Sequence, residues 1–339
     1  MQMIRNTLVK ICVVLAIGIV PATAQTQWKV ANTFQIGGDG GWDYVTIDSA
    51  NHRLFVTRST HTMAIDEETG KVLGDIPSQV RSHGVALAPE VGRGFITDGG
   101  GSGAIVVFDL NTYAVVGKIP AIPDADGIIY DAKQKKVLVV SGDGNALLTF
   151  SPDIDPKNGK LDPPIALGGS PEFLATDGTG KVYVNLEDKN LVAVVDLKTR
   201  SVVARWPVSP GGHPVGMAID APAHRIFVGC RNPQKLVVIN TDTGAVEASL
   251  PIGTGVDATK FGAGQVFASA GDGTLTVAEK KDGEWIVVQT VKTQAGARTM
   301  GLDESAGKAF LPTAELEAVP NGRPKPKPGT FMIIEVGRP

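Results

Sequence analysis

The chain is poor in cysteine, with only Cys12 and Cys230 among its 339 residues, and aromatic residues make up 6% of it. Cys12 belongs to the N-terminal segment described below, and the single cysteine that remains cannot form an internal disulfide. A chain of this length can bury an adequate core without crosslinks. The sequence also has no H-x-x-x-H, no paired CxxC and no continuous Asp-x-Asp-x-Asp-Gly loop with a terminal Glu. These absences exclude a disulfide scaffold and a metal motif contained in one short stretch.

Long apolar runs are absent after the N-terminus, where residues 11–20 form an apolar run of ten residues. Arg5 and Lys10 precede this run, and Ala22-Thr-Ala24 has the small-x-small pattern of a cleavage site. The run is too short to cross a bilayer as a helix. We therefore expect a secretory signal peptide in residues 1–24, cut after Ala24, and a periplasmic or secreted mature protein without a membrane span.

The chain also lacks a large excess of charge of either sign, with 32 Lys and Arg against 35 Asp and Glu. Removal of Arg5 and Lys10 with the signal peptide moves the formal net charge from −3 to −5. A mildly acidic chain without a basic stripe does not suit general binding to phosphate backbones. We expect no nucleic-acid partner and a monomeric protein.

Glycine and proline are abundant, with 41 and 22 residues, and an apolar phrase recurs about every 40 to 46 residues. The phrase contains short apolar strands separated by turns and ends in Asp followed by Thr-Gly or a similar pair. Three copies show it clearly: Arg53–Gly70, Lys181–Thr199 and Arg225–Gly244. A repeat of this length built only from short strands is typical of propeller blades.

Seven copies of the repeat align on the turn after the first strand. The marker pairs are Ile47-Asp48, Leu87-Ala88, Tyr130-Asp131, Thr176-Asp177, Ile219-Asp220, Phe261-Gly262 and Leu302-Asp303. After the seventh marker only two strands follow, at 308–312 and 330–336, whereas a spare strand at 28–36 precedes the first repeat. The sequence predicts an all-β, seven-bladed β-propeller of four-stranded blades, one domain over residues 25–339. The N-terminal strand would pair in the last blade and close the ring, which covers an edge that would otherwise be free.

The repeat resembles a known family. The strand Leu/Val-Tyr/Phe-Val-Thr/Asn, followed by Val-x-Val-Ile-Asp-x-x-Thr-Gly, is similar to the YVTN β-propeller repeat. Gly296-Ala-Arg-Thr-Met-Gly-Leu-Asp303, with Leu311-Pro-Thr-Ala-Glu315, resembles the last blade of YncE-like exported propellers. The resemblance implies an exported propeller that serves as a binding platform, and it supplies no catalytic residues. Blades two and three depart from the pattern at Gly99–Gly103 and at the insertion Ser151–Pro164.

In a propeller the first strand of each blade lines the central channel, so the residue five positions before each marker is expected at the channel mouth. We call these the mouth positions, and they are Asp43, His83, Asp126, Glu172, Val215, Asp257 and Arg298. His213 lies two residues before Val215 and can replace it. The prediction depends on register, because a slip of one residue turns a side chain to the other face.

Two functions suit this ring of carboxylates, histidine and arginine. The first is a binding platform for a small ligand or a periplasmic protein partner at the mouth. The second is a metal-dependent, lactonase-like hydrolase or lyase, with a divalent cation held by Asp126, Glu172, His83 and Asp257. Arg298 would then orient a substrate carboxylate. A ring that only binds ordered channel water is the structural alternative.

Several other residues carry weaker signals. His52 and His224 occupy equivalent turns opposite the mouth, and we expect turn residues there. Cys230, beside an arginine, is either an activated thiol or a small core residue, and the second is the simpler interpretation. The loop 313–329, with alternating Pro and Lys or Arg, is predicted to project beside the mouth as a flap, a docking strand or a tolerated insertion.

Overall fold

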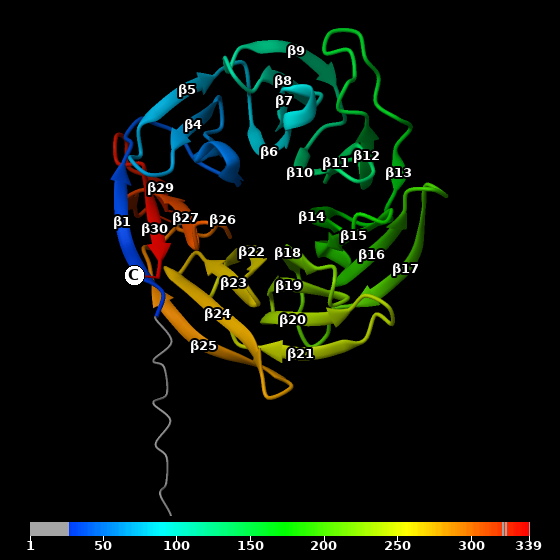
Figure 1. The fold of residues 1–339 in the computed structure, drawn as a ribbon, viewed down its shortest axis with the longest axis vertical. Coiled ribbons are helices and arrows are strands. Elements are labelled where there is room, and N and C mark those ends of the chain that lie inside the picture. The colour runs from blue at the N-terminus through cyan, green and yellow to red at the C-terminus, as the bar shows by residue number, and fades with distance from the viewer. Residues whose placement is uncertain (1–26, 321, 323, 339) are drawn as a thin grey trace, which may run out of the picture.

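The computed structural model describes residues 27–320, 322 and 324–338. The predicted signal peptide lies outside these residues. The described chain forms a ring of seven four-stranded antiparallel sheets around a central channel (Figure 1). The seven-bladed all-β propeller predicted from the repeat is therefore confirmed.

Six blades use four consecutive strands, in order from the channel outwards. The first three are β2 (Val45–Asp48), β3 (Arg53–Thr57), β4 (Thr62–Asp66) and β5 (Val72–Ile76); β6 (Ser82–Ala88), β7 (Arg93–Asp98), β8 (Ala104–Asp109) and β9 (Val115–Pro120); and β10 (Ala125–Asp131), β11 (Lys136–Ser141), β12 (Ala146–Phe150) and β13 (Ile165–Ala166). The next three are β14 (Pro171–Thr176), β15 (Lys181–Leu186), β16 (Leu191–Asp196) and β17 (Ser201–Pro207); β18 (Pro214–Asp220), β19 (Arg225–Arg231), β20 (Gln234–Asn240) and β21 (Val246–Leu250); and β22 (Val256–Gly262), β23 (Gln265–Ala270), β24 (Thr274–Lys281) and β25 (Glu284–Lys292).

The seventh blade joins the two ends of the described chain. Its order is β26 (Gly301–Asp303), β27 (Lys308–Thr313), β30 (Met332–Gly337) and β1 (Lys29–Gln35). Strand β1 pairs antiparallel with β30, so it is the outermost strand of this sheet. Trp28, just before β1, donates its indole N–H to Gln265 of the neighbouring blade at 2.9 Å and packs edge-on against Phe267.

Short elements fill the connections between strands. Three 3-10 turns are η1 (Ser49–Asn51), η2 (Pro89–Val91) and η3 (Glu187–Lys189). His52 and His224 have positive φ values of 50° and 56° and occupy the turns after the first strands, where they pair with Glu67 and Asp242. They are turn residues, as predicted. Among the described residues, no helix is long and apolar enough to cross a membrane.

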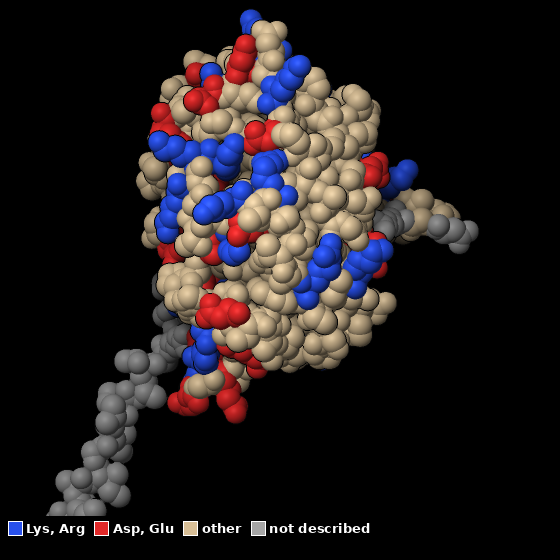
Figure 2. Space-filling model, turned by 90° about the vertical axis from the view of Figure 1, so that its right-hand side faces the viewer, with Lys and Arg blue, Asp and Glu red and all other residues tan. Residues whose placement is uncertain are grey.

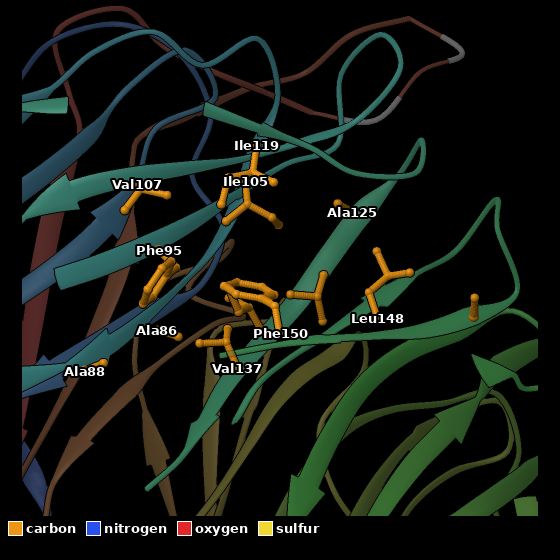
Figure 3. Close-up of a cluster of buried hydrophobic side chains, with 13 residues drawn as sticks. Ala86, Ala88, Phe95, Ile105, Val107, Ile119, Ala125, Val137, Leu148 and Phe150 are labelled. Atoms are coloured by element: carbon orange, nitrogen blue, oxygen red, sulfur yellow. The ribbon is translucent and has the colours of Figure 1, made fainter. Parts of the chain in front are cut away.

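The core consists of apolar layers between neighbouring blades. One layer joins the second and third blades, where Phe95 and Phe150 pack edge-to-face at 5.3 Å between ring centroids (Figure 3). The second strands, such as β3, are buried on both faces, which explains their continuous apolar sequence. The fourth strands are more exposed, and β17 alternates exposed with partly buried residues. On the outer side of the ring, basic and acidic side chains are interspersed over a largely uncharged surface (Figure 2).

Candidate functional site at the channel mouth

The mouth positions lie where the first strands deviate from regular pairing. In five of the seven blades, the register between the first and second strands shifts across the mouth position. A bulge of this kind changes the direction in which a side chain points. In the first and last blades the mouth residues, Asp43 and Arg298, precede the first strand. Irregular backbone therefore presents the ring of side chains, and strict strand alternation does not apply to it.

A buried hydroxyl or amide at or near the end of a second strand fixes the mouth backbone of the next blade. Thr57 donates to the carbonyl of His83 at 2.7 Å, and Thr97 donates to that of Asp126 at 2.6 Å. Asn185 and Ser269 make the corresponding bonds to Val215 at 2.8 Å and Arg298 at 2.5 Å. These donors occupy the Thr/Asn position that ends the repeated strand pattern Leu/Val-Tyr/Phe-Val-Thr/Asn, or the corresponding position in a blade that departs from the pattern. The repeat thus holds four of the seven mouth residues through the preceding blade.

Three mouth residues form one compact group. His83 Nδ1 lies 2.7 Å from Asp43 Oδ2 and 3.5 Å from Asp126 Oδ1. The group offers one ligand atom per residue, all within 4.8 Å of one another. His83 Nε2 and Asp126 Oδ1 are buried and have no hydrogen-bond partner. Two carboxylates and an imidazole with unsatisfied buried atoms fit a divalent cation.

The protonation of this group follows from its burial and its charges. Burial alone would lower the pKa of His83, but the hydrogen bond with Asp43 and the charge of Asp126 outweigh it and raise the pKa to about 8. Burial raises the pKa of Asp126 to about 7, partly offset by the charge of His83. At neutral pH the group therefore holds protons that a bound cation would displace.

A second group gathers on the other side of the mouth. Arg298 Nε donates to Asp257 Oδ2 at 2.5 Å, and Arg231 Nη2 donates to Asp257 Oδ1. Arg231 Nε also donates to the carbonyl of Val256 at 3.1 Å, and Arg298 Nη2 to that of Trp42 at 3.4 Å. Burial raises the pKa of Asp257, whereas the two guanidinium groups oppose this. One carboxylate is thus shared by two arginines that keep further N–H groups free for a ligand.

Glu172 and His213 lie at the edge of the second group. Glu172 Oε1 is 3.9 Å from Arg231 Nη1, and His213 Nε2 is 2.9 Å from Glu187 Oε2. Burial and a hydrogen bond with Glu187 raise the pKa of Glu172 to about 9. Glu172 is therefore protonated at neutral pH and adds no negative charge opposite Arg231.

The loop 313–329 lies beside this second group. Its two short strands, β28 (Leu316–Glu317) and β29 (Lys325–Pro326), pair as a hairpin that we call the flap. Glu315 accepts a hydrogen bond from the Lys327 backbone at 2.8 Å and pairs with its ammonium at 3.0 Å. The flap residues Leu316, Pro324 and Pro326 line a cavity of about 570 Å3. Its remaining walls are Gly41, Trp42, Arg231, Gly255, Gly271, Gly296 and Arg298.

The structure groups the candidate metal ligands differently from the set predicted from the sequence. Asp43 joins His83 and Asp126, whereas Asp257 is occupied by two arginines and Glu172 faces Arg231 and Glu187. The group that can hold a cation thus contains Asp43 in place of Glu172 and Asp257. The difference arises because Arg231 reaches the mouth from the end of β19, where it pairs with Asp257 and lies 3.9 Å from the protonated Glu172.

Sequence reasoning missed Arg231, Glu187 and Trp42. Arg231 ends the second strand β19 and Glu187 directly follows the second strand β15, and only a pattern of charge at the ends of those strands could have indicated them. Cys230 is fully buried, and burial raises the pKa of its thiol to about 12, so it is a core residue and no activated thiol. Ser82 donates to the carbonyl of His61 at 3.3 Å and does not form a dyad with His83.

Comparison with known proteins bears on the fold. No family model matches the chain, and no curated protein matches it. Hydrazine synthase from Kuenenia stuttgartiensis is a similar solved structure, with a TM-score of 0.70 and 14% identity over 81% of this chain and 94% of that chain. The WD40 β-propeller domain of Doa1 has a TM-score of 0.73 and 12% identity over 93% of this chain and 98% of that chain. At these identities the similarity shows the propeller fold alone.

Proposed function

We propose that this β-propeller is a binding platform whose mouth takes a small anionic ligand, held by Arg231 and Arg298 beneath the flap. The observation that carries the proposal is the sharing of Asp257 by two guanidinium groups at the wall of the 570 Å3 cavity. Because Glu172 is protonated at neutral pH, its carboxyl does not neutralise the second arginine. A carboxylate or phosphate group on the ligand would complement this excess of positive charge.

The cavity and the flap support a small ligand. A volume of about 570 Å3 lies within the range of small-molecule sites. Trp42 and Leu316 provide apolar surface beside the guanidinium groups, while glycines at four wall positions leave room for the ligand. The ligand would therefore carry an anionic group next to a moderately apolar body. A protein partner that inserts an acidic side chain is the macromolecular alternative.

The experiment is a calorimetric screen of the purified chain with succinate, citrate, glycerol phosphate and their neutral analogues. We expect an anion to bind and Arg298→Met to weaken it at least tenfold, since the charge-assisted hydrogen bonds are lost. Arg225→Met is the matched control, because Arg225 begins the same strand that Arg231 ends and pairs with Glu247 away from the mouth. Equal binding by wild type and Arg298→Met would contradict the proposal.

The Asp43–His83–Asp126 group supports a second candidate, a metal-dependent hydrolase or lyase of the lactonase-like kind. A divalent cation at this group would supply a Lewis acid and could activate water. The three residues would hold the cation, with His83 binding through Nδ1, and the buried Asp126 Oδ1 would gain a partner. The protein would stay a binding platform if the cation served only to hold a ligand.

Metal analysis and melting curves test this candidate. After chelator treatment, added Mn²⁺, Zn²⁺ or Ca²⁺ should raise the melting temperature, because a cation at 100 times its dissociation constant adds about 2.7 kcal/mol. Asp126→Asn should abolish the shift, whereas Asp242→Asn, in the His224 pair of an opposite turn, should keep it. A shift that Asp126→Asn retains would place the cation elsewhere, and no shift would remove the candidate.

Export and family are part of the proposal. The charged start, the apolar run and the Ala-x-Ala pattern support cleavage after Ala24, and the repeat phrase supports membership of the YVTN family with YncE-like relatives. The intact mass of the protein isolated from its native host tests the first point. A mass that corresponds to the chain from Gln25 supports export, whereas an uncleaved chain would contradict it.

A further inference from the structure

A second cavity lies in the channel, next to the mouth. It has a volume of about 350 Å3 and is walled by the first strands, from the residues next to the mouth positions to the marker pairs. Its walls are mainly aliphatic and include Val45, Ile47, Val85, Leu87, Ile128 and Leu302. A cavity of this size and lining suits a small ligand with an apolar body.

Two aromatic rings line this cavity beside the carboxylates of the mouth. Tyr44 and Phe173 immediately follow two mouth residues, and their ring centroids are 5.0 Å apart. Both rings line the cavity. Burial and the nearby carboxylates Asp126, Asp43, Glu172 and Asp257 raise the pKa of Tyr44 well above its ordinary value, so its hydroxyl stays neutral. The mouth and this cavity therefore present different chemistry.

Lys260 is the feature that gives this cavity a specific chemistry. Its side chain comes from β22, lines the cavity and holds its ammonium 5.5 Å from the centre of the Phe173 ring. In the described part of the chain, no carboxylate lies within ion-pair distance of Lys260 Nζ. Burial lowers its pKa to about 8, which still leaves the amine mostly protonated at pH 7.

An ammonium group among apolar side chains is costly unless an opposite charge compensates it. The cation–π contact with Phe173 compensates only part of this cost. The other channel cations have acidic partners, since Arg231 and Arg298 share Asp257. Lys260 instead faces an aliphatic cavity that is accessible from solvent, where a ligand can supply the missing anion.

We propose that this cavity is a second binding site, which takes a small carboxylic acid with an apolar body. The carboxylate pairs with Lys260, and the apolar body packs against the aliphatic walls. A phosphate fits less well, because a dianion requires several donors and the cavity offers one ammonium group. The site is distinct from the anion site proposed at the mouth, since the two cavities share no wall residue.

The test uses 3-phenylpropionate and hexanoate, with 3-phenylpropionamide and 1-hexanol as neutral analogues, in calorimetric titrations of the purified chain at pH 7. We expect the acids to bind at least tenfold more tightly than their neutral analogues. Lys260→Met, which keeps the side-chain length, should remove this preference, and Lys260→Arg should retain part of it. Arg298→Met identifies any binding at the mouth, and Arg225→Met, which lies outside both sites, should leave these affinities unchanged.

The outcomes separate the alternatives. Equal affinity for acid and neutral analogue would overturn the assignment, as would undiminished acid binding by Lys260→Met. Loss of acid binding in Arg298→Met, with Lys260→Met unaffected, would place the acid at the mouth and also overturn it. Absence of acid binding by the wild type has the same consequence. Lys260→Met should melt at a higher temperature than the wild type, which shows that the variant is folded, and Lys260→Gln provides a second neutral variant.

Discussion

The strongest single prediction concerns the proton on His83 in the metal-free protein. His83 contacts Asp43 and lies near Asp126, with its side chain 11% exposed, and Arg81 opposes the effect of the carboxylates. The pKa is raised from 6.5 to about 8, which corresponds to about 2 kcal/mol of preferential interaction with the imidazolium. Because the folded-state pKa is the higher one, this stability is complete below pH 6.5 and is lost as the pH rises through about 8.

Two measurements check this value after chelator treatment. Proton–carbon NMR of the histidine rings, assigned through His83→Gln, should show a titration midpoint near 8, and Asp43→Asn should lower it because the strongest favourable contact is lost. Urea unfolding at pH 6 and pH 9 should show a loss of stability that is smaller in His83→Gln by about 2 kcal/mol.

The carboxyl of Asp126 requires a control in this experiment. Its pKa is raised to about 7, so its contribution has the same sign and is lost between about pH 4 and pH 7. Because the charge of His83 lowers the pKa of Asp126, His83→Gln also shifts this carboxyl, so the urea comparison is repeated in an Asp126→Asn background; Asp242→Asn should leave the His83 midpoint unchanged. A wild-type midpoint at or below 6.5 would show that burial outweighs the carboxylates, and the account of this group would be wrong.

Three further predictions concern stability and reactivity. Thr97→Val should lower the free energy of unfolding in urea by about 1–3 kcal/mol, because the buried carbonyl of Asp126 loses its 2.6 Å donor; a change below the error of the measurement would contradict this. Phe34→Ala should cost about 3–5 kcal/mol, since Phe34 of β1 is 7% exposed in the core that closes the ring, whereas an effect near that of a surface substitution would show that β1 contributes little. Cys230 should resist a thiol reagent at pH 8 in the native protein and react fully in urea; fast native modification would refute its burial.

The fold was accessible from the sequence because each blade repeats the same local pattern. All seven marker pairs coincide with the ends of the first strands β2, β6, β10, β14, β18, β22 and β26, within one residue. The second strands are buried on both faces, which explains the continuous apolar runs that mark each repeat in the sequence. The flap could not be predicted as a hairpin, because β28 and β29 are two residues each and β29 contains a proline.

The sequence identified which residues lie at the mouth, but it did not show which of them pair with one another. Counting five residues back from each marker identified Asp43, His83 and Asp126, because the number of residues between the mouth position and the marker is the same in every blade. The bulges, however, change the side-chain directions, and the direction within a bulge does not follow from alternation. Arg231 comes from the second strand and enters the ring from the side, which no period within the first strands could reveal.

The separation of charge within the mouth decides which ligands suit it. On one side, Asp43, His83 and Asp126 hold protons that a divalent cation can displace. On the other side, Arg231 and Arg298 share a single carboxylate and keep donors for an anion. A ligand that carries a carboxylate and coordinates a metal through a second oxygen would engage both sides at once, and each group would raise the affinity of the other. Titration of citrate with and without Mn²⁺ measures this coupling: tighter binding of citrate with the cation, lost in both Asp126→Asn and Arg298→Met, is the expected result, whereas equal binding with and without Mn²⁺ would show that the two groups act independently.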